Sequence, residues 1–204
     1  MRGPSANLSR VKRIAIAVGA LALVAVLAIG LSQTGGEAGG GKSAGGACGE
    51  VPAALEGAPA PLASLHEQGC DLVGGGPTAF KKRLAELRGY PVVVNKWASW
   101  CGPCRAEFPH FQRLSTSLGK RVAFLGVDSN DNYADATKFL ARYPVSYPSY
   151  KDGDTRVAQV VNGVIASPTT AFYDARGKLK FVHQGQYRDE ASLRRDIERY
   201  AIGG

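Results

Sequence analysis

Hydrophobic and polar positions follow two different periods along the chain, which predicts strands interleaved with helices. An apolar, β-branched run over 91–97 is typical of a buried strand, and Pro91 is tolerated at its first position. Apolar residues then recur at helical spacing, at Phe108, Phe111, Leu114 and Leu118. Gly119 is a stop signal, and Pro109 predicts a kink near the first turns of this helix. A strand followed at once by a helix is therefore expected.

The same two patterns predict the remaining elements. We expect helices over 77–87, 131–143, 154–161 and around 193–200, and strands over 122–127, 147–150, 169–173 and 179–184. A glycine-containing turn at 174–178 makes the last two strands a β-hairpin. Residues 51–65 are rich in Pro and Ala, and we expect extended chain or a short hairpin there. The order of elements implies an α/β fold, a mixed sheet with helices on both faces.

The N-terminal part of the chain has a different composition. Residues 1–13 contain four basic side chains and no acid, and residues 14–31 are uninterruptedly apolar. A single transmembrane anchor with a cytoplasmic tail is expected, so that the rest of the chain is exported. A cleavable signal peptide is the alternative, although the apolar run exceeds the usual signal-peptide core. Residues 32–60 are predicted to be a flexible linker and 61–204 the folded domain.

Charge and motifs exclude several function classes. The formal net charge is +8 over 204 residues, but four of the positive charges lie in the N-terminal tail, so nucleic-acid binding is not predicted. The sequence contains no phosphate loop, dinucleotide fingerprint or internal repeat, and we expect no cofactor. Its three histidines share no local spacing, so no metal site is expected.

The strand-to-helix junction carries the sequence Trp-Cys-Gly-Pro-Cys, with cysteines at 101 and 104. A helix N-terminus favours a thiolate, which makes Cys101 the expected nucleophile. Cys104, one turn further on, is the expected resolving cysteine, which attacks a mixed disulfide formed at Cys101. A zinc site is less consistent with the sequence, because Cys48 and Cys70 do not supply a second paired spacing.

The other two cysteines have a different expected role. In an oxidising compartment, Cys48 and Cys70 are predicted to form a structural disulfide that closes a loop of 22 residues. The alternative is a second dithiol that exchanges electrons with Cys101 and Cys104. Neither Cys48 nor Cys70 lies at a convincing helix N-terminus, which favours the structural role.

These motifs resemble those of a known family. The Trp-Cys-Gly-Pro-Cys junction and the Ser167-Pro168-Thr169 sequence before the terminal hairpin resemble the thioredoxin fold. More closely, Asn-Lys-Trp-Ala-Ser-Trp-Cys-Gly-Pro-Cys-Arg-Ala-Glu-Phe-Pro over 95–109 resembles the signature of the TlpA/ResA family of membrane-anchored, extracytoplasmic thiol-disulfide oxidoreductases. The resemblance covers about 87–201, and 62–87 departs from the family's usual opening hairpin.

The resemblance implies a thioredoxin-like fold with additional elements. It predicts a strand-helix insert between residues 128 and 168, a stretch longer than one helix requires. It also implies a cis bond between Ser167 and Pro168, with Pro168 against the cysteines and the adjacent backbone pairing with a substrate chain. Ser167 and Thr169 are therefore substrate-binding candidates, together with Trp100, Gly102 and Pro103 around the nucleophile.

A proton acceptor for Cys104 is needed as well. Asn95 stands where thioredoxin carries a buried aspartate, and a neutral amide cannot accept that proton. The resemblance implies an active-site role for Glu107, whose partly desolvated carboxylate would act as the base. The alternative from the sequence is an ordinary first-turn acid favoured by the helix dipole.

The expected function is reduction of disulfides in exported, cysteine-containing proteins. The Cys-Gly-Pro-Cys tetrapeptide is that of thioredoxins, whose potential is about −270 mV. The resemblance suggests apocytochrome c as a substrate. We also expect a membrane electron-transfer partner as the source of electrons, and a monomeric protein. Two alternatives stay open, a disulfide-forming oxidase and a non-catalytic module that binds client chains.

Overall fold

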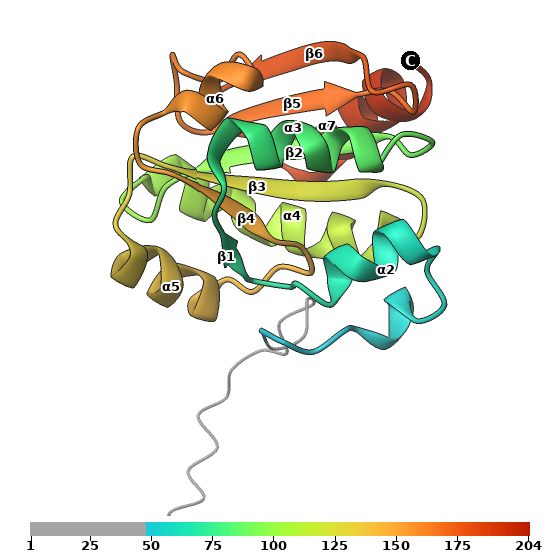
Figure 1. Cartoon of the computed structure of the whole chain (residues 1–204), viewed down its shortest axis with the longest axis horizontal. Coiled ribbons are helices and arrows are strands. Elements are labelled where there is room, and N and C mark those ends of the chain that lie inside the picture. Colours follow the sequence, from blue (N-terminus) through green and yellow to red (C-terminus); the bar gives the residue numbers. More distant parts are fainter. Residues whose placement is uncertain (1–47) are drawn as a thin grey trace, which may run out of the picture. The chain divides into compact units, whose positions relative to one another are not determined.

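Six strands form one mixed sheet in the part of the chain that this computed structural model describes, residues 48–204 (Figure 1). They are β1 (Leu72–Val73), β2 (Val92–Trp97), β3 (Ala123–Ser129), β4 (Ser149–Asp152), β5 (Thr169–Tyr173) and β6 (Leu179–Gln184). Their spatial order is β1-β4-β3-β2-β5-β6. The first four of these run parallel to one another, whereas β5 is antiparallel to both β2 and β6.

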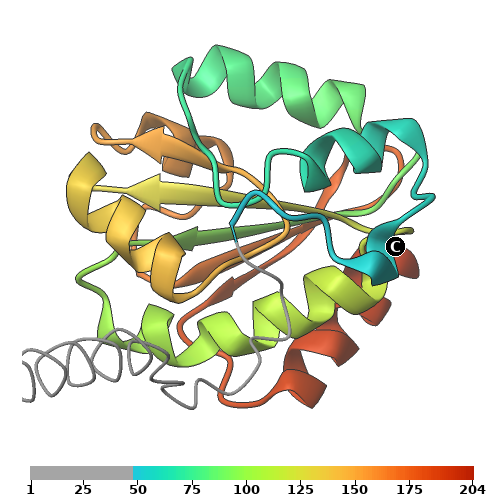
Figure 2. The same ribbon diagram turned by 90° about the horizontal axis from the view of Figure 1, so that it is seen from below.

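Helices cover both faces of the sheet, as the order of elements predicted. They are the 3-10 turn η1 (Ala53–Leu55), α2 (Ala60–His66), α3 (Gly76–Glu86), α4 (Gly102–Leu118), α5 (Tyr133–Arg142), α6 (Arg156–Val160), α7 (Glu190–Asp196) and the π-helix η2 (Ile197–Ile202). Figure 2 shows α3 on one side of the sheet and α4 on the other. Two apolar cores result, one under α2, α3 and α6 and one under α4, α5 and α7.

The predicted elements match the structure closely, and the hairpin strands match residue for residue. Between β3 and β5 lie α5, β4 and α6, so the additional strand and helix expected there are present. The prediction of extended chain or a hairpin over 51–65 is wrong. That stretch forms η1 and α2, because Pro61 at the second helical position is compatible with a helix start and Leu55, Leu62 and Leu65 are buried.

The predicted basic tail, the apolar run 14–31 and most of the linker lie outside the described residues. Among residues 48–204, no helix has the length and apolarity that crossing a membrane requires.

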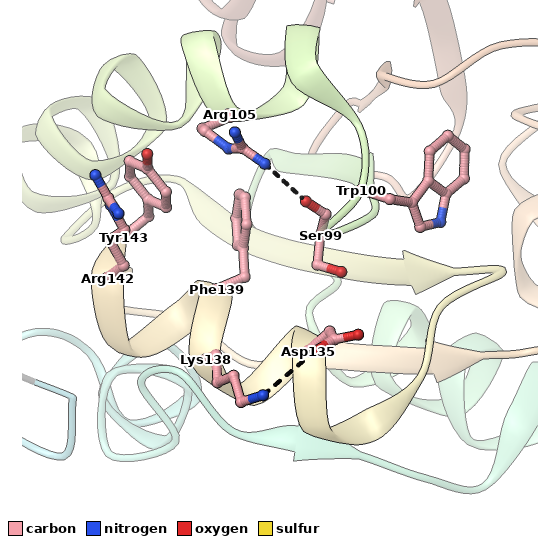
Figure 3. A pocket seen from close by; sticks show the side chains of 8 residues that line it. All are labelled: Ser99, Trp100, Arg105, Asp135, Lys138, Phe139, Arg142 and Tyr143. Atoms are coloured by element: carbon pink, nitrogen blue, oxygen red, sulfur yellow. Dashed lines mark hydrogen bonds and ion pairs between the residues drawn. The ribbon is translucent and has the colours of Figure 1, made fainter.

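Trp97, at the end of β2, anchors the core behind the cysteines. Its ring is fully buried and lies 5.3 Å from the Phe108 ring and 4.8 Å from the Phe139 ring, measured between centroids. Its indole Nε1 donates a hydrogen bond of 3.1 Å to Ser149 Oγ. Phe139 belongs to α5, whose side chains and those at the start of α4 line a cavity beside the chain 99–105 (Figure 3).

We expect Gly126→Ala to destabilise this core. A Cβ at position 126 would lie 2.0 Å from Ser149 Oγ and 3.1 Å from Trp97 Nε1, so their hydrogen bond cannot persist in its present geometry. Overpacking of this kind costs about 1–3 kcal/mol. Urea unfolding monitored by tryptophan fluorescence measures the loss. Gly102→Ala is the control, because a Cβ there meets nothing within 4 Å.

A disulfide joins Cys48 to Cys70, as predicted, with a sequence separation of 22. It ties the start of the described chain to the turn after α2. Replacing both residues with serine should lower the free energy of unfolding by about 3 kcal/mol, because the cross-link restricts the unfolded chain. Urea unfolding of the double variant, with the 101–104 disulfide intact, measures this. Loss of exchange activity with unchanged stability would instead support the electron-exchanging alternative.

Candidate active site

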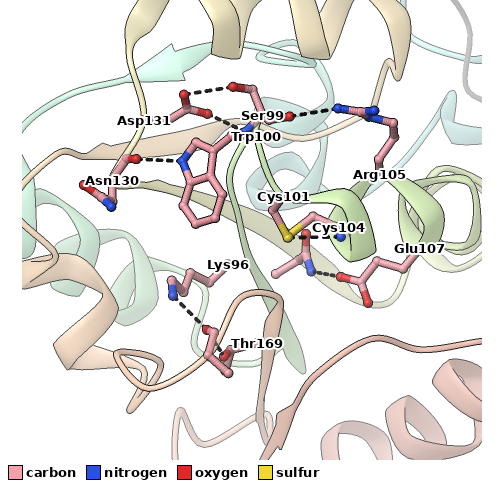
Figure 4. The surroundings of a disulfide bond; sticks show 12 residues. Lys96, Ser99, Trp100, Cys101, Cys104, Arg105, Glu107, Asn130, Asp131 and Thr169 are labelled. Atoms are coloured by element: carbon pink, nitrogen blue, oxygen red, sulfur yellow. Dashed lines mark hydrogen bonds between the residues drawn. A yellow bond between two sulfur atoms is a disulfide. The ribbon is translucent and has the colours of Figure 1, made fainter.

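The second disulfide joins Cys101 to Cys104 at the point where β2 leads into α4 (Figure 4). Cys101 is the N-cap residue of α4, and its Sγ accepts a hydrogen bond of 3.1 Å from the Cys104 backbone N–H. Cys101 is 3% exposed and Cys104 is fully buried, whereas Gly102 and Pro103 between them are exposed. The N–H groups at this helix end stabilise negative charge on the Cys101 sulfur.

Glu107 lies three residues after Cys104, on the same face of α4 as Cys104, and its side chain is fully buried. Its carboxyl accepts hydrogen bonds from Asn95 Nδ2 at 2.8 Å and from the Tyr187 backbone N–H at 3.0 Å. Burial raises the pKa of Glu107 to about 8, although both hydrogen bonds act to lower it. A carboxyl in this state can exchange a proton near neutral pH.

The groups around Glu107 come from three distant segments. Asn95 lies on β2, and its Oδ1 is buried without a hydrogen-bond partner. Tyr187 follows β6, and its hydroxyl donates a hydrogen bond of 2.6 Å to Asp196 Oδ2. The third group is Tyr147, whose pKa is raised mainly by burial and, to a smaller extent, by the nearby carboxyl of Glu107. Glu107 is thus held by a fixed, largely buried polar network.

The segment before β5 reaches the same end of the sheet. The Ser167–Pro168 peptide bond is cis, as the resemblance implied. Because Thr169 pairs with Lys96 across β5 and β2, Pro168 lies level with the strand end that leads to Cys101. Lys96 Nζ donates a hydrogen bond of 2.8 Å to the Ala166 carbonyl, and burial lowers its pKa. Lys96 was not among the predicted site residues, although a lysine within a buried apolar strand was the signal in the sequence.

Trp100 is 59% exposed beside the disulfide, and its Nε1 donates to the Asn130 carbonyl at 2.9 Å. A cavity of about 280 Å³ separates Trp100 from Ser167, with Val164 and Ile165 on its rim. Ile165 is 87% exposed. Trp100 and the segment before Pro168 therefore offer apolar surface on the same side of the cysteines.

The loop before Cys101 is held by Asp131, next to a second acid, Asp128, and neither was among the predicted site residues. The Asp131 carboxyl accepts hydrogen bonds from the Ser99 backbone N–H and, at 2.9 Å, from Ser99 Oγ. Asp128, at the end of β3, is buried, and burial together with Asp131 raises its pKa to about 8. The signal in the sequence was the pair of aspartates directly after an apolar strand.

The structure therefore brings together most of the predicted site residues. Cys101, Cys104 and Glu107 share the first turns of α4, and Trp100 and Ser167 line one cavity. Cys48 and Cys70 lie elsewhere, beside α5, where Cys48 and Leu140 line another cavity. His66, one of the three histidines that predicted no metal site, is buried, and its two ring nitrogens each lie 3.1 Å from a carbonyl oxygen, of Ser146 and of Gly119. No cluster of metal-ligating side chains occurs in residues 48–204.

Known proteins are similar to this chain in fold and in sequence. The solved structure of MTB DsbF, in its mixed oxidized and reduced forms, aligns with a TM-score of 0.51 and 31% identity, over 55% of this chain and 82% of that one. The thiol:disulfide interchange protein DsbE of Pseudomonas fluorescens biotype C is 32% identical over 151 residues, which cover 71% of this chain and 78% of the relative. The thioredoxin-like fold is thereby confirmed.

A second curated relative is the thiol-disulfide oxidoreductase ResA of Geobacillus thermodenitrificans strain NG80-2. It is 34% identical over 111 residues, which cover 53% of this chain and 62% of the relative. A family profile described as Redoxin matches residues 56–197. The chain is thus an enzyme, and a non-catalytic binding module is not retained. It belongs to the Redoxin family and is a thiol-disulfide oxidoreductase of the DsbE and ResA type.

Proposed function

We propose that this protein is a membrane-anchored reductant of disulfides in exported, cysteine-containing proteins. The observation that carries the proposal is the buried Glu107 carboxyl, one turn beyond Cys104 in α4. Because its pKa is about 8, this carboxyl is mostly neutral near pH 7 and offers no positive charge that would stabilise a thiolate, and its ionised fraction disfavours one. A dithiol whose thiolates are disfavoured gives up its electrons more readily, because strong stabilisation of the reduced form is what makes an oxidant.

The exchange proceeds in two steps. The Cys101 thiolate attacks one sulfur of the client disulfide, so that a mixed disulfide forms and the other client sulfur leaves as a thiolate. Cys104 then loses its proton and attacks the Cys101 sulfur, which forms the 101–104 disulfide of this structure and releases the second client thiolate. Two electrons pass from the chain to the client, and the client sulfurs take up two protons.

Glu107 is the proposed proton acceptor for Cys104. Its pKa of about 8 lies close to that of a thiol, near the optimum for proton transfer at neutral pH. Asn95 and the Tyr187 backbone hold the carboxyl in place. The proposed client strand lies along Ser167, Pro168 and Thr169, with Trp100, Gly102 and Pro103 as its other contacts.

Location and electron supply complete the proposal. The basic tail and the apolar run 14–31 support a single-pass anchor in the cytoplasmic membrane, with the enzyme domain outside. The 48–70 disulfide supports an oxidising compartment, where a membrane partner must return electrons to the 101–104 disulfide. Apocytochrome c is the proposed client, because the sequence over 95–109 resembles the signature of the TlpA/ResA family.

A peptide containing Cys-Xaa-Xaa-Cys-His, the haem-attachment motif, tests this function. The full chain, reduced and freed of reductant, is mixed with the oxidised peptide, and peptide thiols are counted after acid quenching. The comparison substrate is a peptide with Ser-Xaa-Xaa-Cys in place of the motif, dimerised through a disulfide between two chains. Faster reduction of the Cys-Xaa-Xaa-Cys-His peptide than of this dimer supports an apocytochrome client. Quantitative oxidation of the reduced peptide by the oxidised chain would show the opposite electron flow and contradict the proposal.

A further inference from the structure

A cavity larger than the one beside Ser167 lies between the loop before Cys101 and helix α5 (Figure 3). It measures about 460 Å³ and is open to solvent. One wall comes from Ser99, Trp100 and the start of α4, and the other comes from the exposed side of α5. The nucleophile Cys101 directly follows Ser99 and Trp100, so a ligand in this cavity lies next to the site of exchange.

The charged side chains of this cavity are unbalanced. Arg105, Lys138 and Arg142 line it together with a single acid, Asp135. Lys138 Nζ lies 3.6 Å from Asp135 Oδ1, which accounts for one of the three cations. No carboxylate among residues 48–204 lies within ion-pair distance of either arginine in the structure. Two guanidinium groups therefore face solvent at one cavity.

Both arginines are oriented by contacts that leave hydrogen-bond donors available. Arg105 donates to the Ser99 carbonyl at 3.3 Å, which uses one of its five N–H donors. The Arg142 guanidinium lies 5.8 Å from the centroid of the Tyr143 ring. Arg105 is at the start of α4 and Arg142 ends α5, so the fold itself brings these charges together across the cavity.

Guanidinium groups bind carboxylates through paired, planar hydrogen bonds. Phe139 and Tyr143 also line the cavity, and their aromatic rings suit an apolar side chain next to the acid. Opposite charge near a reactive site also steers encounter and fixes orientation.

We propose that this cavity binds an acidic segment of the client protein, placed beside the client's disulfide. The inference rests on the proposed function, since it names the chemistry of the client that Cys101 attacks. Its occupant is a polypeptide stretch with Asp or Glu side chains for Arg105 and Arg142 and an apolar side chain against Phe139 and Tyr143.

Binding is tested without exchange. The probe is a fluorescent peptide in which acidic residues and one leucine flank a Cys-Xaa-Xaa-Cys sequence with both cysteines replaced by serine. A second peptide replaces the acids with lysine. Fluorescence anisotropy with the full chain gives both dissociation constants at low and high salt.

The chain offers a matched control. Arg105→Glu/Arg142→Glu reverses two charges in the cavity, and Arg121→Glu/Lys120→Glu reverses two exposed charges where β3 begins, at the other end of the strand. We expect the wild type and the control to bind the acidic peptide about tenfold more tightly than the basic one, and high salt to reduce this preference. The cavity variant should lose or invert it.

Equal affinity of the wild type for both peptides, or the same loss in the control as in the cavity variant, would overturn the inference. Reduction rates of the same peptides with both cysteines restored and oxidised distinguish a failure of this inference from a failure of the proposed function. If the reduced wild type reduces acidic and basic disulfides equally well, reductase activity stands and the docking inference fails. If it reduces neither while acidic binding persists, the proposed function fails and the binding site stands.

Discussion

Cys101→Ser abolishes disulfide reduction by this protein, with an expected loss of at least about 10³-fold in the exchange rate. A serine hydroxyl is not ionised near neutral pH and forms no mixed disulfide, so the first step has no nucleophile. The measurement is the initial rate of peptide disulfide reduction by the full chain. Far-ultraviolet circular dichroism confirms that the variant is folded.

Cys104→Ser has a different expected outcome. The first step is retained, but the resolving thiol is absent, so the mixed disulfide at Cys101 accumulates. Mass spectrometry without reductant should show about one client peptide bound per chain, and none with the Cys101→Ser variant. Trapping through position 104 in Cys101→Ser instead would reverse the assigned roles, which rest on the position of Cys101 at the N-cap of α4 and on the complete burial of Cys104.

Glu107→Gln should slow the second step by about 10²-fold at pH 7, the usual contribution of a general base. Glutamine keeps an acceptor for Asn95 but cannot take the Cys104 proton. Single-turnover rates of mixed-disulfide resolution measure this. The wild-type rate should rise with pH to a plateau above about 8, and the variant should lose the part of that rise due to the carboxyl. Glu67→Gln, an exposed acid, is the control.

The raised pKa of Glu107 also makes the stability of the folded chain depend on pH. Because the pKa of Glu107 is about 8 in the folded chain and 4.5 without burial, the folded state holds a proton that the unfolded state loses between these values. Stability therefore falls as pH rises from about 4.5 to 8. The change due to Glu107 is on the order of 4 kcal/mol.

Urea unfolding from pH 5 to pH 8 should therefore show a shallower fall in Glu107→Gln than in the wild type. The variant retains the part of the fall due to Asp128, whose pKa is also raised to about 8. A wild-type stability that is constant or rises over this range would contradict the burial of a protonated Glu107. Unchanged resolution rates in Glu107→Gln would remove its role as the base.

The parts of the fold with a local signal were predictable from sequence. The apolar run of β2, the helical spacing of α4 and the hairpin of β5 and β6 each contain their own pattern and turn residues. The additional strand and helix between β3 and β5 were also expected from the pattern, over 147–150 and 154–161, and only their bounds differ, because both elements are short. Helix α2 was missed, because its Pro- and Ala-rich sequence resembles a linker. Only the burial of Leu62 and Leu65 in the structure shows that it belongs to the folded domain.

Some of the active-site residues were likewise predictable from sequence, and others were not. The spacing of Cys101, Cys104 and Glu107 along one helix is visible in the sequence. One of the two hydrogen-bond partners of Glu107, the Tyr187 backbone N–H, is not visible there, because Tyr187 lies 80 residues away and its backbone donates irrespective of its side chain. The approach of Asp131 to Ser99 across 32 residues likewise follows from the parallel pairing of β2 and β3, which sets their ends side by side.

The direction of electron flow is the central claim, and the reduction potential of the 101–104 disulfide tests it most directly. The full chain is equilibrated with dithiothreitol or glutathione buffers, acid-quenched and analysed for free thiols, with the 48–70 disulfide monitored separately by peptide mapping. We expect a potential near or below about −250 mV, as for a reductant fed by a membrane partner. A potential above about −180 mV would make this protein a disulfide donor and contradict the account.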